Sequence, residues 1–268
     1  MEANLSSRLA TAAVGVPLLI GLVGWAPTWM FTTVFLLLTG AALREYFQIV
    51  FPGRFWDQCV GVLFGLALAA ALLASDKLDF RVALGVILLV GFATGLFFRS
   101  GLEARLQRLL WTLLGGFYVG FLVPHWVLLF RQPNGRSWVV FVMLTIMAGD
   151  SAAYFAGRRF GRTKLAPEIS PGKTVEGALA YLIASILIGL SMAGYLFGDV
   201  ARVEAAMLSV ALAILGQIGD LFESWIKRVC SVKDSGTLLP GHGGVLDRLD
   251  SLIFPAVFTT AYLRYFHT

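Results

Sequence analysis

Long apolar segments alternate with short polar connectors along the whole chain. Apolar runs close to 20 residues indicate helices that cross a hydrocarbon layer. The pattern predicts nine spans of about this length, at about Leu9–Trp25, Trp29–Leu43, Cys59–Ala74, Val82–Phe98, Leu109–Phe130, Trp138–Ala156, Val175–Phe197, Ala205–Ile226 and Leu249–Tyr262. We therefore expect an all-α integral membrane protein.

The distribution of basic residues predicts the orientation. With nine spans, 15 of the 21 Lys and Arg residues fall on the side that holds the N-terminus. Basic residues accumulate on the cytoplasmic side of membrane proteins, so we expect a cytoplasmic N-terminus and an outside C-terminus. The charged, Gly-rich connectors 158–174 and 227–248 then face the cytoplasm. The first span resembles a signal peptide, but the spans that follow favour an uncleaved helix.

The composition supports this class. Hydrophobic residues make up 58% of the chain, charged residues 14%, and the mean hydropathy is +0.79, which excludes a soluble domain of this length. The net charge of +5 does not indicate nucleic-acid binding, because the basic residues lie between apolar spans. We expect residues 1–140 to embed the protein in the membrane.

Ionisable residues gather where the eighth span ends. Such groups are costly near hydrocarbon and are kept where they act chemically. Asp220, Ser224 and Lys227 share one helix face by their spacing, with Glu223 and Arg228 on the adjacent row. Carboxylates recur at the start of the last span, at Asp247 and Asp250. We expect the two carboxylate-bearing helix ends to face each other across a pocket. The alternative is a set of interhelical ion pairs that lock the bundle.

A second polar cluster follows Asp150 in the sixth span. The basic connector Arg158–Lys164 leads to Lys173 and Glu176. Gly172-Lys173-Thr174 resembles the end of a Walker A loop, but Pro167 stands where the pattern needs glycine and no strand is expected before it, so we reject a P-loop. The loop suits anionic phosphates, and its alternative role is anchoring to anionic lipid headgroups.

One charged pair is given no role. Arg44 and Glu45, at the predicted end of the second span, read as a surface ion pair.

The C-terminal motifs resemble those of the phosphatidate cytidylyltransferases, the CDP-diacylglycerol synthases. The pattern S-x-x-K-R, K-D, H-G-G-x-x-D-R-x-D matches this chain from Ser224 to Asp250 without departure. The upstream block from Gly149 to Gly177 is similar to the family's second shared block, whereas the first 140 residues match only as multiple spans.

The resemblance implies transfer of the cytidylyl group of CTP to phosphatidate, giving CDP-diacylglycerol and pyrophosphate in phospholipid biosynthesis. It also implies Mg²⁺, with K⁺ as a second cation, and a catalytic transmembrane domain formed by residues 141–268. A homodimer with contacts in residues 1–140 is implied as well. The site would lie at the cytoplasmic face of the inner (cytoplasmic) membrane.

The site residues follow from the matched motifs together with the charge clusters. The expected metal ligands are Asp220 and Asp247. The other catalytic candidates are Ser224, Lys227 and Arg228. The candidates for substrate and phosphate binding are Lys173, Lys233, Asp234, His242, Gly243, Gly244, Arg248 and Asp250. In this interpretation the cations neutralise the triphosphate and leaving pyrophosphate, and no protein nucleophile is required.

Two rival classes stay open from the residues alone. An ion-coupled transporter would use Asp150 and Asp220 as cation sites, although no inverted repeat is evident. A related enzyme could act on another lipid phosphate. The D-G-x-x-A-R motif of CDP-alcohol phosphotransferases is absent from the sequence.

Overall fold

The computed structural model describes residues 5–75, 77–97, 101–197, 202–238, 241 and 243–266. Helices dominate these residues, and one two-stranded hairpin interrupts them. Helices satisfy their own backbone hydrogen bonds, as a hydrocarbon layer requires. The structure agrees with the all-α prediction and adds the hairpin.

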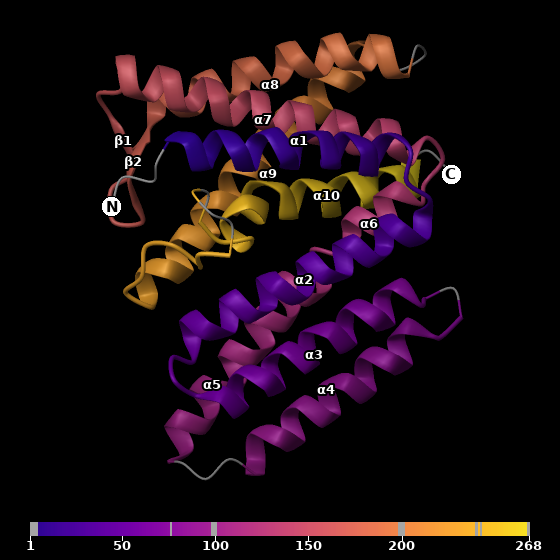
Figure 1. Ribbon diagram of the computed structural model, residues 1–268, viewed down its shortest axis with the longest axis vertical. Coiled ribbons are helices and arrows are strands. Elements are labelled where there is room, and N and C mark those ends of the chain that lie inside the picture. Colours follow the sequence, from indigo (N-terminus) through magenta and orange to yellow (C-terminus); the bar gives the residue numbers. More distant parts are fainter. Residues whose placement is uncertain are drawn as a thin grey trace. The chain divides into compact units, whose positions relative to one another are not determined.

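The chain forms two compact units. The first contains the residues up to Leu128 together with Asp234–Asp247. Its elements are α1 (Leu5–Gly24), α2 (Thr28–Val50), α3 (Phe55–Leu73), α4 (Phe80–Phe97), α5 (Leu102–Gly115), the π-helix η1 (Gly116–Phe121) and the start of α6 (His125–Phe130). The helices α2, α3 and α4 lie side by side in chain order (Figure 1).

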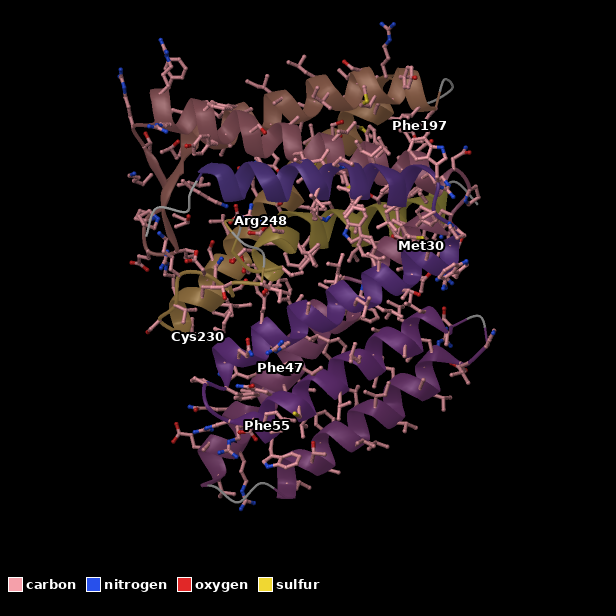
Figure 2. The ribbon with its side chains drawn as sticks, in the orientation of Figure 1. Met30, Phe47, Phe55, Phe197, Cys230 and Arg248 are labelled. Carbon is pink, nitrogen blue, oxygen red and sulfur yellow. The ribbon has the colours of Figure 1, made fainter. Side chains whose placement is uncertain are left out.

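Glycines permit close packing inside the first unit. A Cβ on Gly120 of η1 would lie 2.5 Å from the Cα of Gly65 in α3, and one on Gly61 would lie 2.4 Å from the ring of Phe47. Phe47, labelled in Figure 2, is fully buried between the rings of Tyr46 and Phe51. Small residues at such contacts let helix backbones approach each other.

The fifth predicted span, Leu109–Phe130, is not one α-helix. The helix α5 already begins at Leu102 and changes at Gly116 into the π-helix, which is followed by a turn and α6. Side chains of neighbouring helices press on this region: a Cβ on Gly115 would lie 2.2 Å from the ring of Tyr46. Glycine has low helix propensity, and the wider π turn accommodates the packing. The apolar pattern alone does not distinguish a π-helix from an α-helix.

The second unit contains Leu129–Lys233 and the residues from Arg248 onward. Its elements are α7 (Gly135–Phe160), β1 (Lys164–Ala166), β2 (Ser170–Thr174), α8 (Val175–Leu196), α9 (Arg202–Val229) and most of α10 (Leu246–Phe266). The chain turns through the hairpin so that α8 lies along α7 (Figure 1), and α9 contacts both helices.

The hairpin corrects one premise of the sequence analysis. Strand β1 pairs antiparallel with β2, with Lys164 opposite Thr174, so a strand does precede the Gly172–Thr174 stretch. The P-loop stays rejected, because these residues belong to a strand and not to a phosphate-binding loop. Thr174 ends the strand and caps α8, since its Oγ1 accepts a hydrogen bond from Gly177 N at 3.1 Å.

The membrane spans agree with the prediction in part. Six helical segments among the described residues are long and apolar enough to cross a membrane: Thr28–Val50, Phe55–Leu73, Leu102–Phe130, Gly135–Phe160, Val175–Leu196 and Arg202–Val229. Shorter apolar helices occur at Ala13–Gly24 and Phe80–Leu96. The count of nine spans and the orientation of the termini stay predictions.

Candidate functional site

The C-terminal half of α9 carries the first group of predicted site residues. Ser224 Oγ donates a hydrogen bond to Asp220 Oδ1 at 3.3 Å, and Lys227 Nζ lies 2.7 Å from Glu223 Oε2. Within each pair the two residues are one helical turn apart, as their spacing in the sequence predicted. The side chain of Glu223 is only 1% exposed, so Lys227 supplies the counter-charge that a buried carboxylate requires.

The β-hairpin joins this group through Lys173. Lys173 Nζ on β2 lies 2.6 Å from Asp220 Oδ2, and the two side chains are 24% and 30% exposed. Arg228 Nε donates to the carbonyl of Ile169, in the turn directly before β2, at 3.1 Å. The hairpin is thus fixed to α9 at two points. The Lys173–Asp220 contact joins a strand to a helix, so it is not one of the interhelical ion pairs of the structural-lock alternative, and it remains partly accessible.

Two further acids accompany Asp220. Asp150 of α7 accepts a hydrogen bond from Ser251 Oγ at 3.2 Å. Its carboxylate is close enough to that of Asp220 for the two negative charges to repel each other. Asp250 of α10 interacts electrostatically with Asp220 and Glu223. Helices α7, α9 and α10 therefore bring carboxylates to one region of the second unit. From the sequence, Asp150 was expected to bind a cation only in the rival transporter interpretation, and it is not among the predicted residues of the transferase site.

Glycines on α9 make this convergence possible. A Cβ on Gly219 would lie 2.3 Å from the carbonyl oxygen of Asp250, and one on Gly216 would lie 2.5 Å from the hydroxyl of Tyr181. The backbone of α10 and the side chain of Tyr181 on α8 can therefore approach α9 closely only because these two positions lack side chains.

Asp247 belongs to the first unit, in the segment Asp234–Asp247. Its Oδ2 accepts hydrogen bonds from Ser235 N at 3.0 Å and Gly244 N at 2.9 Å, and its own N–H donates to Ser235 Oγ at 3.2 Å. Asp247 thus closes the Gly-rich loop on itself at the start of α10. Its joint role with Asp220 at a metal stays a prediction.

Glu45 was misread from the sequence as part of a surface ion pair. Helix α2 continues to Val50, and Glu45 lies inside it with an exposed fraction of only 4%. Its carboxylate accepts hydrogen bonds from Val245 N at 3.0 Å and Leu246 N at 2.9 Å. The predicted span ended too early, at Leu43. The apolar residues that follow Glu45 were the signal that the helix continues.

The remaining predicted residues are more exposed. Lys233, Asp234 and Arg248 are exposed, and Arg248 is labelled in Figure 2. Gly243 has a φ of +83°, a left-handed conformation that favours glycine. His242 lies outside the described residues.

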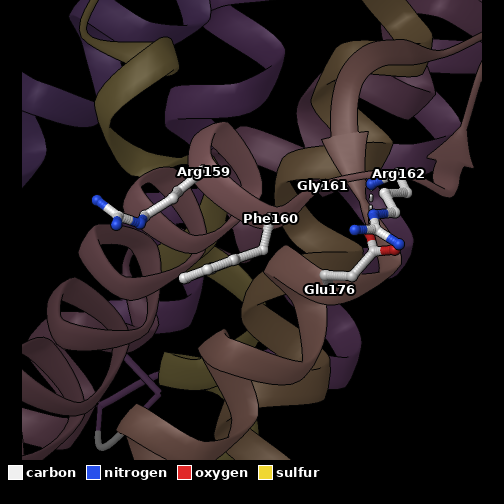
Figure 3. Close-up of a pocket in the computed structure, with 5 residues that line it drawn as sticks. All are labelled: Arg159, Phe160, Gly161, Arg162 and Glu176. Atoms are coloured by element: carbon white, nitrogen blue, oxygen red, sulfur yellow. Dashed lines mark hydrogen bonds between the residues drawn. The ribbon is translucent and has the colours of Figure 1, made fainter.

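A separate pocket lies where α7 meets the hairpin and α8. It has a volume of about 510 Å³ and is lined by Arg159, Phe160, Gly161, Arg162 and Glu176 (Figure 3). The carboxylate of Glu176 accepts hydrogen bonds from the N–H groups of Arg162 and Thr163, each at 3.1 Å. None of the predicted site residues lines the pocket. Its arginines belong to the basic connector for which the sequence predicted binding of anionic phosphates or of lipid headgroups.

The donor chemistry around Asp220 fits Mg²⁺. Carboxylate and hydroxyl oxygens are the ligands that this hard cation prefers, and Asp220 already attracts the ammonium group of Lys173. Among the described residues, no group of three or more His, Cys, Asp or Glu side chains is arranged to hold a metal ion. Mg²⁺ is often held by one or two carboxylates, with phosphates of the substrate and water completing its shell.

The sequence of this chain is similar to those of known proteins. The model of a family described as the cytidylyltransferase family matches residues 6–266. The uncharacterised protein YnbB of Escherichia coli (strain K12) is 34% identical over 265 residues, which are 94% of this chain and 85% of YnbB. A phosphatidate cytidylyltransferase of Synechocystis is 33% identical over 94% of both chains. One of Brucella suis is 45% identical over 147 residues, 54% of each chain.

Proposed function

Because the chain belongs to the cytidylyltransferase family, we propose that it transfers the cytidylyl group of CTP to phosphatidate in phospholipid biosynthesis. The products are CDP-diacylglycerol and pyrophosphate. The observation that carries the proposal is the similarity to the Synechocystis protein named phosphatidate cytidylyltransferase, which extends over 94% of both chains. The motif from Ser224 to Asp250, which lies within the matched region, also supports it.

The reaction needs positioning and charge neutralisation more than covalent catalysis. A phosphate oxygen of phosphatidate attacks the α-phosphorus of CTP, so one P–O bond forms while the α–β anhydride bond breaks and pyrophosphate leaves. Both reactants are anionic, and fixed cations stabilise the charge that moves onto the leaving group. In the second unit, Lys173 and Lys227 form ion pairs with the α9 acids Asp220 and Glu223, and Arg228 follows Lys227 on the same helix.

We assign the carboxylate of Asp220 to the cation site, with Ser224 orienting it through their hydrogen bond. Asp247 is retained as a second ligand on the strength of the motif alone. Mg²⁺, when bound, would neutralise phosphate charge and orient the phosphates. Lys173 keeps Asp220 in place and supplies a positive charge beside the phosphates.

One assay tests the proposed activity. Purified protein in mixed micelles should incorporate radiolabelled CTP into chloroform-extractable lipid when phosphatidate is present, and should do so only with Mg²⁺. Incorporation that does not depend on phosphatidate would contradict the substrate assignment. Omission of Mg²⁺ and addition of K⁺ test the proposed cations separately.

We also propose that the protein works as a homodimer. Light scattering of the purified protein measures its oligomeric state.

The orientation gives a testable prediction. We expect cysteines introduced at Lys164 and Thr237, both exposed, to react with a membrane-impermeant thiol reagent only from the cytoplasmic side. A cysteine at Thr268 should react only from outside. The background for this experiment replaces Cys59 and Cys230 by serine, since both are free thiols. Labelling of positions 164 and 237 from opposite sides would overturn the proposed topology.

A further inference from the structure

We propose that Glu45 is a positioning residue for the cytidylyl transfer: its carboxylate holds the segment Asp234–Asp247, and through it Asp247, in the arrangement the reaction needs. The inference rests on the proposed function for the role of Asp247. It concerns contacts that lie within the first unit.

The carboxylate of Glu45 uses both oxygens. Oε1 accepts from Val245 N at 3.0 Å, whereas Oε2 accepts from Leu246 N at 2.9 Å and from Ser235 Oγ at 3.2 Å. The residue is 4% exposed. A buried carboxylate without such donors would be strongly unfavourable, so the loop and Glu45 stabilise each other.

Two glycines fit the loop around this carboxylate. A Cβ on Gly236 would lie 2.6 Å from Glu45 Oε1. A Cβ on Gly244 would lie 2.5 Å from Glu45 Oε2 and 2.0 Å from Ser235 Oγ. Both arms of the loop therefore close on Glu45 only because they lack side chains at these positions.

Hydrogen bonds continue from Glu45 to Asp247. Ser235 donates its hydroxyl to Glu45, while its Oγ accepts from Asp247 N and its N–H donates to the carboxylate of Asp247. Glu45 also holds the N–H groups of Val245 and Leu246, directly before Asp247. The position and direction of the Asp247 side chain are thus set from α2, about 200 residues earlier in the sequence.

The contact requires two acceptor oxygens. A glutamine at position 45 has nearly the same shape, but its amide nitrogen would face one of the N–H donors. It would lose at least one hydrogen bond and leave a buried N–H group unpaired. Glu45→Gln is therefore the most conservative substitution that tests the proposal.

The experiment compares Glu45→Gln with Glu103→Gln, the same chemical change on an exposed side chain at the start of α5. In mixed micelles we expect Glu45→Gln to lower kcat about 10- to 100-fold, the usual effect of removing a partner that orients a ligand residue, with little change in KM for CTP. Hydrogen exchange of the full chain should become about tenfold faster in the 234–247 peptide and stay unchanged in α8. Glu103→Gln should match the wild type in both readouts.

Each alternative outcome is decisive. Wild-type kcat in Glu45→Gln, or unchanged exchange in the 234–247 peptide, would overturn the proposal. A general rise in exchange with a lower melting temperature would show a merely structural role. If Glu45→Gln does not fold, Ser235→Ala removes the same link to Asp247 and should give the same local exchange and a smaller loss of kcat. A wild-type protein without transferase activity would refute the proposed function, while the exchange experiment would still test the contact.

Discussion

Replacement of Asp220 by asparagine is expected to lower kcat at least about 100-fold, because it weakens the binding of the cation that would stabilise transition-state charge. The carboxylate of Asp220 accepts a hydrogen bond from Ser224 and forms an ion pair with Lys173, and it is the group to which we assign the cation. Asparagine keeps the shape but removes the charge. Steady-state kinetics at saturating Mg²⁺ measures the effect, and near-wild-type turnover would contradict the assignment.

The stability of Asp220→Asn should stay close to that of the wild type. The ion pair with Lys173 is partly exposed, and such pairs contribute up to about 1 kcal/mol. A loss of that size shifts the melting temperature of a protein of this length by only about 2–4 °C. Asp79→Asn, a change in an exposed loop residue, is the matched control and should keep full activity. A large fall in melting temperature would assign Asp220 to the structural lock.

Asp247→Asn should lose activity to a similar degree but by a different route. Both oxygens of Asp247 accept hydrogen bonds from Ser235 N, so the amide of asparagine would also loosen the loop. Hydrogen exchange in the 234–247 peptide should therefore rise in Asp247→Asn and stay unchanged in Asp220→Asn.

The sequence predicted the all-α membrane class and several of the spans, because lipid imposes a strong and simple pattern. The segment expected at Val175–Phe197 is observed as α8 (Val175–Leu196), and α9 contains the expected Ala205–Ile226. The charge clusters on α9 were also predictable, since helical spacing fixes which side chains share a face. These features depend on residues that are close together in the chain.

The features that the sequence did not predict depend on contacts between distant residues. The hairpin β1–β2 is short and lacks the alternation of polar and apolar residues that marks a strand. The Lys173–Asp220 pair and the contacts of Glu45 with residues 245 and 246 are set by packing, which neither local propensity nor charge patterning encodes. Glu45 shows the consequence, because the sequence predicted it to be part of a surface ion pair and the structure shows it buried.

Replacement of Lys227 by alanine should lower kcat by a factor of about 100 or more, because its ammonium group lies on the helix that carries Asp220 and is placed to neutralise phosphate charge. The structure adds a second expected effect. Lys227 lies 2.7 Å from the buried carboxylate of Glu223, and removal of one partner of a buried pair is destabilising by about 3–5 kcal/mol. Lys227→Ala should therefore be both less active and less stable.

A double variant separates the two effects. Glu223→Gln removes the charge that Lys227 neutralises, so Lys227→Ala combined with Glu223→Gln should recover most of the melting temperature lost in the single variant. If Lys227 also acts on the reacting phosphates, kcat should stay low in the double variant. Recovery of kcat together with stability would show that Lys227 serves only to neutralise Glu223. A raised KM for CTP with an intact kcat would instead indicate ground-state binding of the nucleotide.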